Sequence, residues 1–281
     1  ESAVAQVADV VMSETWQRGG ALPAGGVDRL AGMAHTSGCR IIGAETFTAD
    51  LNNSRWTNDP YSLKPTADCA FCGGLNHVVF HSYAHQPFVG PQPGMTMGPW
   101  GIQFNRNNTW WNQAKPFISY LRRCAFMLRL GHPVRDVCVF GGERASTSPR
   151  TLSKAEGYTA DICQEHALMN DVSVKDGWLA FPSGMRYRYL ALNHEAALSP
   201  AVLQRIQALT EAGATVLAPS ARPERAPTLT DYPACDAVVR TFATALWGTD
   251  GKGGPRGKGR FIVTDDPAGF PPHAPAPPGI E

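Results

Sequence analysis

The chain has 281 residues, of which 43% are hydrophobic and 17% are charged, and its formal net charge is +1. This composition is typical of globular proteins, and the length is sufficient for two hydrophobic cores. A near-neutral charge without a block of Lys or Arg gives no electrostatic reason to expect nucleic acid or a membrane surface as partner, and no run of residues is long or apolar enough to cross a membrane. Neutral carbohydrates fit better, because seven tryptophans offer faces on which sugar rings stack.

The first third of the chain alternates between helix and strand patterns. Apolar spacing predicts a helix over residues 2–18 and another over residues 27–35. An apolar run over residues 39–44 then ends at Glu45, where Thr46-Phe47-Thr48 stops it, and a second strand-like run over residues 77–80 ends just before His81. Polar groups that follow consecutive strands are typical of a (β/α)8 barrel, whose active site lies at the C-terminal ends of its strands. The alternative is that Glu45 begins an ordinary exposed loop.

A long connection and a helix follow the second strand. Residues 82–113 are rich in Gly, Pro, Asn and Trp. Structureless segments of this length in compact domains are usually functional or disordered, and the tryptophans within it favour function. Residues 115–130 carry apolar side chains on one helical face, and Gly131 and Pro133 close this helix.

The second half of the chain predicts a small doubly wound α/β domain. Strands are predicted over residues 134–140, 186–192, 215–218 and 261–263, and Asp176-Gly177 marks a hairpin within residues 172–181. Ser199-Pro200 begins a helix that ends at Gly213, and a further helix covers residues 235–247. The predicted domains are therefore 1–132, 133–264 and a Pro/Gly-rich linker over 265–281.

Seven cysteines are scattered along the chain, and we expect most of them to be buried thiols. Cys69 and Cys72 form a lone Cys-x-x-Cys, with a structural role as the first interpretation and a metal or a disulfide as the alternatives. Residues 1–14 lack a basic signal-peptide region. Because the sequence begins without Met and ends in a Pro-rich tract, we expect a piece of a longer protein.

Several short motifs occur in a characteristic order. Those nearest the predicted strands and the long loop are Ala44-Glu45-Thr46-Phe47-Thr48, Gly74-Leu75-Asn76-His77, His81-Ser82-Tyr83-Ala84-His85-Gln86-Pro87-Phe88, Phe104-Asn105-Arg106, Thr109-Trp110-Trp111 and Gly142-Glu143. With these motifs the sequence resembles the α-L-rhamnosidases of glycoside hydrolase family 106, up to about residue 217.

The resemblance implies both a fold and an activity. It implies the last part of a catalytic (β/α)8 barrel, followed by a glutamine-amidotransferase-like α/β domain. The strand ending at Glu45 would be the seventh of the barrel, the strand before His81 the eighth, and residues 115–130 the closing helix. An incomplete barrel predicts an open, apolar sheet surface. The implied activity is removal of terminal α-L-rhamnose with inversion by two carboxylic residues. The resemblance also suggests the periplasm or secretion, which the residues themselves do not predict.

An inverting glycosidase needs a carboxylic acid and a carboxylate about 6.5–9.5 Å apart. Glu45 is the first candidate. Glu143 is the second, because the two preceding glycines allow the backbone to reach toward the barrel mouth; the alternative is a surface-loop Glu. Asp161 and Glu165 are weaker candidates, since we predict them on the solvated face of a helix.

Six further residues are candidates for binding the sugar: Asn76, His81, His85, Asn105, Trp110 and Trp111. The histidines could bind hydroxyl groups or a metal, or fix the loop backbone, and the tryptophans could shape the pocket or anchor the loop. Calcium is a feature of some members of the resembling family. Asp50 and Asp68 offer oxygen ligands, but no acidic run has the spacing of a calcium loop, so the metal stays unassigned.

Two other functions remain open. One is a β-galactosidase-like retaining glycosidase, which shares the barrel-plus-amidotransferase-like layout and needs carboxyl groups about 5–5.5 Å apart. The other is a non-catalytic carbohydrate-binding protein in which Glu45 only accepts hydrogen bonds.

Overall fold

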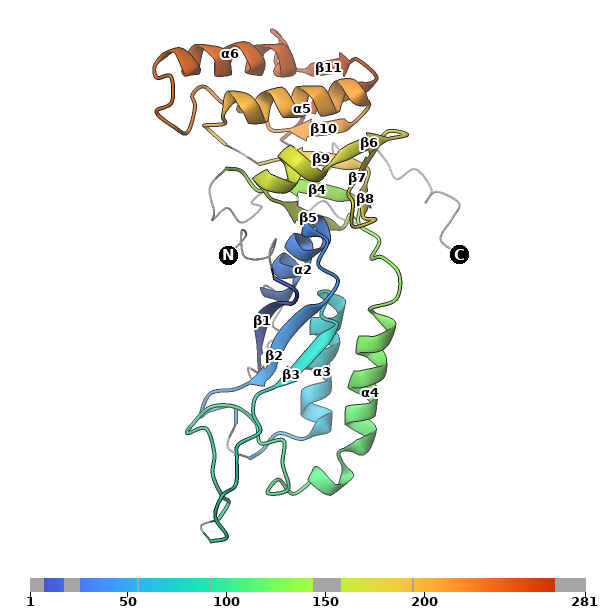
Figure 1. Ribbon diagram of the computed structural model, residues 1–281, viewed down its shortest axis with the longest axis vertical. Coiled ribbons are helices and arrows are strands. Elements are labelled where there is room, and N and C mark those ends of the chain that lie inside the picture. The colour runs from blue at the N-terminus through green and yellow to red at the C-terminus, as the bar shows by residue number, and fades with distance from the viewer. Residues whose placement is uncertain are drawn as a thin grey trace. The chain divides into compact units, whose positions relative to one another are not determined.

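The computed structural model describes residues 8–17, 26–54, 56–90, 92–143, 158–193 and 195–265. The chain divides into two compact units, residues 1–133 and 134–281, each considered by itself (Figure 1). None of the helices in the described ranges is long and apolar enough to cross a membrane. The predicted linker lies outside these ranges, apart from Asp265.

The first unit is built on a parallel sheet of three strands in the order β1-β2-β3. The strands are β1 (Val11–Trp16), β2 (Ile42–Thr48) and β3 (His77–Phe80). Helices α2 (Gly26–Ser37) and α3 (Pro60–Cys72) connect them, while η1 (Trp111–Gln113) and α4 (Lys115–Met127) follow the long loop (Figure 1). Parallel neighbours require such helical crossovers. The predicted helices over residues 27–35 and 115–130 are confirmed as α2 and α4.

The predicted helix over residues 2–18 is wrong in its described part, because residues 11–16 form β1. Val11 and Thr15 are buried whereas Met12 and Glu14 are exposed, the period of two that a half-covered strand has. The end of β2 also needs correction. Thr46, Phe47 and Thr48 continue the strand, so Glu45 lies within it and not at its mouth.

The helices cover one face of this sheet. Val11, Ile42 and Ala44 share a hydrophobic core with Leu63 of α3 and Leu121 of α4. Helix α3 has no counterpart among the predicted elements. It begins at a capping box in which Asp59 accepts a hydrogen bond from the Ser62 amide at 2.8 Å, and Pro60 occupies its first turn, where a missing N–H costs nothing.

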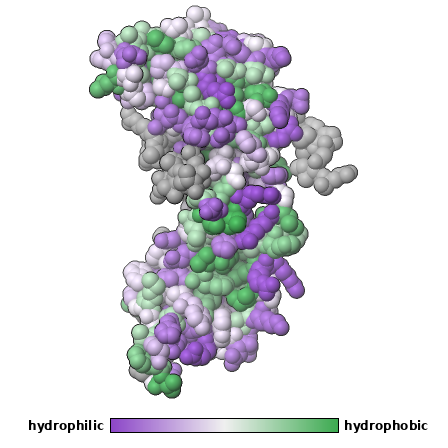
Figure 2. Space-filling model, in the orientation of Figure 1, coloured by the Kyte–Doolittle hydropathy of each residue, from purple (hydrophilic) through white to green (hydrophobic). Residues whose placement is uncertain are grey.

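The other face of the sheet carries residues that the described helices leave uncovered. Met12 and Val79 are exposed there, together with Glu14 and, in part, Glu45. The described strands of this unit do not close into a barrel. The exposed apolar side chains were predicted for an open sheet, and Figure 2 likewise shows hydrophobic residues on the visible surface of this unit. That the sheet is part of a barrel stays a prediction.

The second unit contains a six-stranded mixed sheet in the order β11-β12-β10-β9-β4-β5. Its strands are β4 (Val137–Phe140), β5 (Ala160–Cys163), β9 (Tyr189–Leu192), β10 (Thr215–Ala218), β11 (Gly253–Arg256) and β12 (Gly259–Val263). All neighbours are parallel except β11, which pairs antiparallel with β12. Helices α5 (Pro200–Ala212) and α6 (Ala234–Trp247) pack against each other (Figure 1).

A smaller antiparallel sheet joins β6 (Ser173–Lys175), β7 (Trp178–Ala180) and β8 (Arg186–Tyr187), and a π-helix, η3 (Ala167–Asp171), precedes it. The predicted hairpin is confirmed: Asp176 and Gly177 both have positive φ, 52° and 80°, as a type I′ turn requires. The single strand predicted over residues 186–192 is split, because β8 and β9 belong to different sheets. Helix α5 is confirmed with its Ser199 cap and Gly213 at φ 126°.

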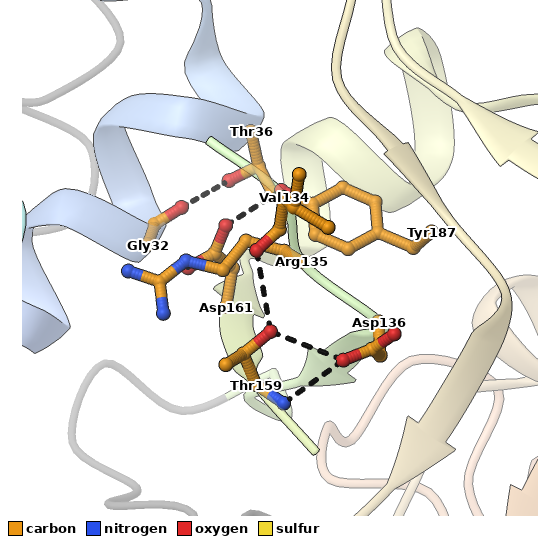
Figure 3. Close-up of polar contacts among 8 residues, drawn as sticks. All are labelled: Gly32, Thr36, Val134, Arg135, Asp136, Thr159, Asp161 and Tyr187. Carbon is orange, nitrogen blue, oxygen red and sulfur yellow. Dashed lines mark hydrogen bonds and ion pairs between the residues drawn. The ribbon is translucent and has the colours of Figure 1, made fainter. Parts of the chain in front are cut away.

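Asp161, Arg135 and Tyr187 of this unit are among the residues drawn in Figure 3, and their contacts correct the prediction for Asp161. Asp161 lies on β5, not on a helix, and is only 2% exposed. Tyr187 donates its hydroxyl proton to Asp161 Oδ2 at 2.9 Å, and Arg135 Nε lies 3.3 Å from Oδ1. Burial, followed by the neighbouring Asp161 charge, raises the pKa of Tyr187 well above its usual value. A solvated role for Asp161 is therefore excluded.

All seven cysteines are free. Cys138, Cys163 and Cys235 are buried, so the expectation that most would be buried is wrong. Cys69 and Cys72 lie in the last turn of α3, where Cys72 is exposed and burial raises the pKa of the Cys69 thiol. Within the described ranges, no three His, Cys, Asp or Glu side chains gather so as to hold a metal ion.

Candidate active site

Glu45 lies on β2, on the uncovered face of the sheet. Its side chain is 40% exposed. Thr48 Oγ1 donates a hydrogen bond to Glu45 Oε1 at 3.0 Å, and His81 Nδ1 lies 3.4 Å from the same oxygen. Thr48 therefore holds one carboxylate oxygen, His81 Nδ1 lies near it without forming a hydrogen bond, and the group stays accessible to a ligand.

Glu14 is directly opposite Glu45 in the register of β1 and β2. Neighbouring strands lie about 4.8 Å apart, and directly paired residues project from the same face. Trp16 Nε1 donates a hydrogen bond to Glu14 Oε2 at 2.9 Å. Glu14 is not among the predicted site residues, because the apolar spacing over residues 2–18 obscures the strand. The sequence Val-Met-Ser-Glu-Thr-Trp does not alternate between apolar and polar residues, so it carries no strand signal of its own.

His81 follows β3 and is 8% exposed. One ring nitrogen faces Glu45, and the other, Nε2, lies 3.1 Å from Met97 Sδ. The backbone of His81 is paired with the long loop, since Ile102 N donates to His81 O at 2.9 Å. Gly101 has φ 78°, and a Cβ there would lie 3.1 Å from His81 Nδ1, so a glycine is needed at this crossing. His81 is thus fixed beside Glu45, in accordance with its predicted place near the site.

The other predicted residues lie at different places in the unit. Asn76 precedes β3, and its side chain bonds Ile42 N at 2.9 Å and Arg40 O at 2.9 Å. It therefore ties together the amino-terminal ends of the strands, away from the end where His81 lies, and its assignment to sugar binding stays a prediction. His85 is exposed in the loop. Asn105 is 1% exposed and its Oδ1 accepts from Asn107 N at 3.0 Å.

Trp110 and Trp111 are partly buried against the core. Trp110 Nε1 donates to Asn58 O at 2.8 Å, and its ring lies 5.9 Å from that of Phe104. These contacts give Trp110 the loop-anchoring role that was the alternative to pocket lining. Trp111 packs against Trp110 with ring centroids 6.4 Å apart.

Glu143 belongs to the second unit, immediately after β4. Its Oε2 accepts a hydrogen bond from Ser199 N at 2.5 Å, at the start of α5. Anionic groups are stabilising at a helix N-terminus. Glu165 lies close enough that burial and the Glu143 charge together raise the pKa of the Glu165 carboxyl. Glu143 thus has a clear local contact, which does not test its predicted catalytic role.

Both potential calcium ligands have other partners. Asp50 Oδ1 accepts from the amides of Asn52 and Asn53, at 3.0 and 3.1 Å. Asp68 is bonded to Lys64 Nζ at 2.5 Å and to the Tyr120 hydroxyl at 2.5 Å. These oxygens already accept hydrogen bonds, and the described residues contain no cluster of metal ligands. The mechanism proposed below therefore does not use calcium.

Glycosidic bond hydrolysis uses two carboxyl groups that flank the scissile bond, and this accessible sheet face presents two carboxylates on paired strands. The fold and this site define an α/β protein with paired carboxylates on an open sheet face. The chain belongs to the α-L-rhamnosidase family, glycoside hydrolase family 106, whose family model matches residues 2–269.

Three individual proteins are similar to this chain, and one of them is named a rhamnosidase. The solved rhamnosidase from Novosphingobium sp. PP1Y superposes with a TM-score of 0.82 at 27% identity, covering 94% of this chain and 26% of that one. A Formosa agariphila protein, provisionally named beta-glucuronidase, is 36% identical over 247 residues, which is 87% of this chain and 21% of that protein. An exo-carrageenase of family 42 from Bacteroides ovatus shares the fold, with a TM-score of 0.51 at 10% identity, 86% of this chain and 30% of that one. The chain thus spans about a quarter of the length of these proteins.

Proposed function

We propose that this chain carries part of the active site of an enzyme that removes terminal α-L-rhamnose from glycosides, and that Glu45 is one of its two catalytic carboxyl groups. The observation that carries the proposal is the direct pairing of Glu14 with Glu45 on the uncovered face of the parallel sheet. Like charges directly opposite each other destabilise a sheet, so such a pair makes sense where function needs both groups. Family membership supplies the substrate class.

The proposed mechanism is inversion by two carboxyl groups. Thr48 holds Glu45 Oε1 and His81 lies beside it, so we assign Glu45 as the base that orients and deprotonates the attacking water. The second carboxyl protonates the leaving oxygen. Glu14 is the candidate within the same unit, and Glu143 is the candidate predicted from the sequence motifs. The bond between the anomeric carbon and the leaving oxygen breaks, and the water oxygen forms a new bond to the anomeric carbon.

We also propose where the first unit belongs in the catalytic domain. Strands β1, β2 and β3 would be the sixth, seventh and eighth strands of a (β/α)8 barrel, with α4 as its closing helix. In support, the three strands are parallel, joined by helices, and carry polar groups toward one end. The second unit would be the amidotransferase-like domain. Its parallel strands, numbered along the chain, lie in the order 5-4-3-1-2, a doubly wound arrangement.

The experiment is hydrolysis of 4-nitrophenyl α-L-rhamnoside by the chain expressed within the longest reading frame that contains it. Glu45→Gln and Glu14→Gln should each lower kcat by about 100-fold or more. Glu224→Gln, a change of an exposed glutamate in the second unit, is the matched control. Glu143→Gln decides whether Glu14 or Glu143 is the second carboxyl. If Glu143→Gln lowers kcat as much as Glu45→Gln does while Glu14→Gln stays fully active, Glu143 is the acid. A folded parent that releases no nitrophenol would remove the rhamnosidase proposal.

A retaining mechanism is the second candidate, and one observation favours it. Residues paired on neighbouring strands start from backbones about 4.8 Å apart, which suits the separation of about 5–5.5 Å that a retaining pair needs. Proton NMR of the sugar first released distinguishes the two: inversion yields β-rhamnose, and retention yields α-rhamnose. If Glu45→Gln abolishes binding of rhamnose while no variant or parent shows turnover, the chain is instead a carbohydrate-binding protein.

A further inference from the structure

A separate pocket opens beside the candidate active site. Its volume is about 300 Å³, and its walls are formed by Leu51, Ser54, Trp56 and Asn58 after β2 and by residues of the long loop between 96 and 108. Two tryptophans line it, Trp56 and Trp100, which are 41% and 45% exposed. Sites for small ligands begin at about this volume, and exposed indole rings provide the apolar faces on which pyranose rings stack.

The pocket is held in shape by polar contacts between and within its two loops. Ser54 Oγ donates to Pro99 O at 3.2 Å, and Asn108 Nδ2 donates to Gln103 O at 3.0 Å. Asn58 fixes the first loop from within by donating to Asn53 O at 2.5 Å. A ligand therefore meets a largely preformed site, which reduces the ordering cost of binding.

Gln103 gives the pocket a polar requirement. The residue is 6% exposed, and its amide oxygen Oε1 is buried without a hydrogen-bond partner. A buried acceptor without a donor is costly, and the terminal amide torsion of Gln is soft. Gln103 lines the pocket, so a hydroxyl group bound there is a candidate donor for Oε1. The missing donor is one that a sugar ring has and a plain aromatic ring lacks.

The pocket adjoins the paired carboxylates through two indole rings. The Trp100 ring meets the Trp16 ring edge to face, with centroids 6.0 Å apart, and Trp16 Nε1 donates to Glu14. An enzyme that removes a terminal sugar has chain beyond the cleaved bond on the leaving-group side only. Glu14 and Glu45 themselves line another pocket, of about 690 Å³. With the terminal sugar in that pocket, the adjoining pocket of Trp56 and Trp100 is left for the leaving group.

From these observations we infer that the pocket lined by Trp56, Trp100 and Gln103 is a leaving-group subsite that binds a pyranose ring, stacked on an indole and hydrogen-bonded to Gln103 Oε1. This inference rests on the proposed function. It assigns to the enzyme a preference for rhamnose attached to another sugar over rhamnose attached to a simple aromatic group.

The test compares two substrates with leaving groups of different chemistry: an α-L-rhamnosyl-glucose disaccharide and 4-nitrophenyl α-L-rhamnoside. Gln103→Leu should lower kcat/KM for the disaccharide about tenfold, the cost of one lost hydrogen bond, and leave the nitrophenyl substrate within about twofold. Trp56→Ala should lower both, because both rings stack. Gln113→Leu, a change of an exposed glutamine outside the pocket, should alter neither. Equal effects of Gln103→Leu on both substrates, or no effect on either, would overturn the subsite.

A binding measurement keeps the subsite separate from the activity. Methyl glycosides of glucose and galactose are titrated by calorimetry into the parent and into Trp56→Ala. Because Trp56 is exposed, we expect this variant to fold, so a loss of binding reports on the pocket. We expect a Kd of about 1 mM for at least one glycoside, weakened about tenfold or more by the substitution. If the parent hydrolyses neither substrate yet binds in this way, the rhamnosidase proposal fails and the sugar subsite stands. If no glycoside binds and the substrate ratio is unchanged, the subsite is wrong.

Discussion

Removal of the Tyr187 hydroxyl is a sharp test of the buried network in the second unit (Figure 3). Tyr187 is fully buried, and its hydroxyl is 2.9 Å from a carboxylate that is itself 2% exposed. Hydrogen bonds to charged groups contribute about 1.5–3 kcal/mol, and an acceptor left without its donor in the interior also loses its compensation for desolvation. Tyr187→Phe keeps the ring, so we expect a loss of about 2 kcal/mol in the free energy of unfolding of this unit.

The effect should also depend on pH. The folded protein holds the Tyr187 pKa well above its usual value, first because of burial and then because of the Asp161 charge. The raised pKa means that Tyr187 contributes stability below about pH 10, where the unfolded side chain is still protonated. That contribution falls as the pH rises above this value, because the unfolded chain then releases a proton that the folded chain retains. Tyr187→Phe should therefore lose less stability than the parent between about pH 9 and pH 11.

Amide hydrogen exchange in β4, β5 and β9 measures the stability of this unit separately from the first. Tyr232→Phe, a change of an exposed tyrosine in the same unit, is the control and should leave the free energy of unfolding of this unit unchanged. A loss below about 0.5 kcal/mol for Tyr187→Phe, together with an unchanged pH slope, would refute the argument that the hydroxyl satisfies the buried carboxylate.

Three further predictions concern the first unit. Glu14→Gln should raise the free energy of unfolding by about 0.2–1 kcal/mol, because it removes a like charge paired with Glu45; chemical denaturation measures this, and a loss of stability would contradict the pairing argument. The hydrogen bond to Asp68, followed by burial, raises the pKa of Tyr120 to about 12, so Asp68→Asn should return it toward 10 in a spectrophotometric titration, and an unchanged titration would exclude Asp68 as the cause. Asp59→Ala should cost about 1 kcal/mol through loss of the α3 cap, whereas a neutral result in urea unfolding would show that the cap is dispensable.

Much of the fold could be predicted where local chemistry and tertiary structure agree. Ser199-Pro200 and Gly213 define the ends of α5 through capping rules that act within a few residues. Asp176-Gly177 likewise specifies its hairpin by backbone conformation alone. These elements need no knowledge of distant partners, and for that reason a single sequence predicts them well.

Prediction failed where a distant partner decides the conformation. Val10, Val11 and Met12 have helical spacing with earlier apolar residues, yet pairing with β2 makes residues 11–16 a strand. Helix α3 has no strong apolar stripe and contains Pro65, so its pattern is weak. Asp161 could not be recognised as buried, because its partners Tyr187 and Arg135 lie 26 residues away on either side in sequence.

The candidate site shows the same division. Glu45 could be predicted because an apolar run beside it marks a strand, although the strand extends past it to Thr48. Glu14 could not, since its importance lies in a register: Glu14 is 31 positions before Glu45 in the numbering, and only a parallel crossover brings the two together. A shift of one residue in that pairing would turn Glu14 to the helix-covered face. The residues that fix this register, such as Met12 packed over Gly43, are therefore as necessary to the proposed chemistry as the carboxylates, because they determine that both acids face the same side.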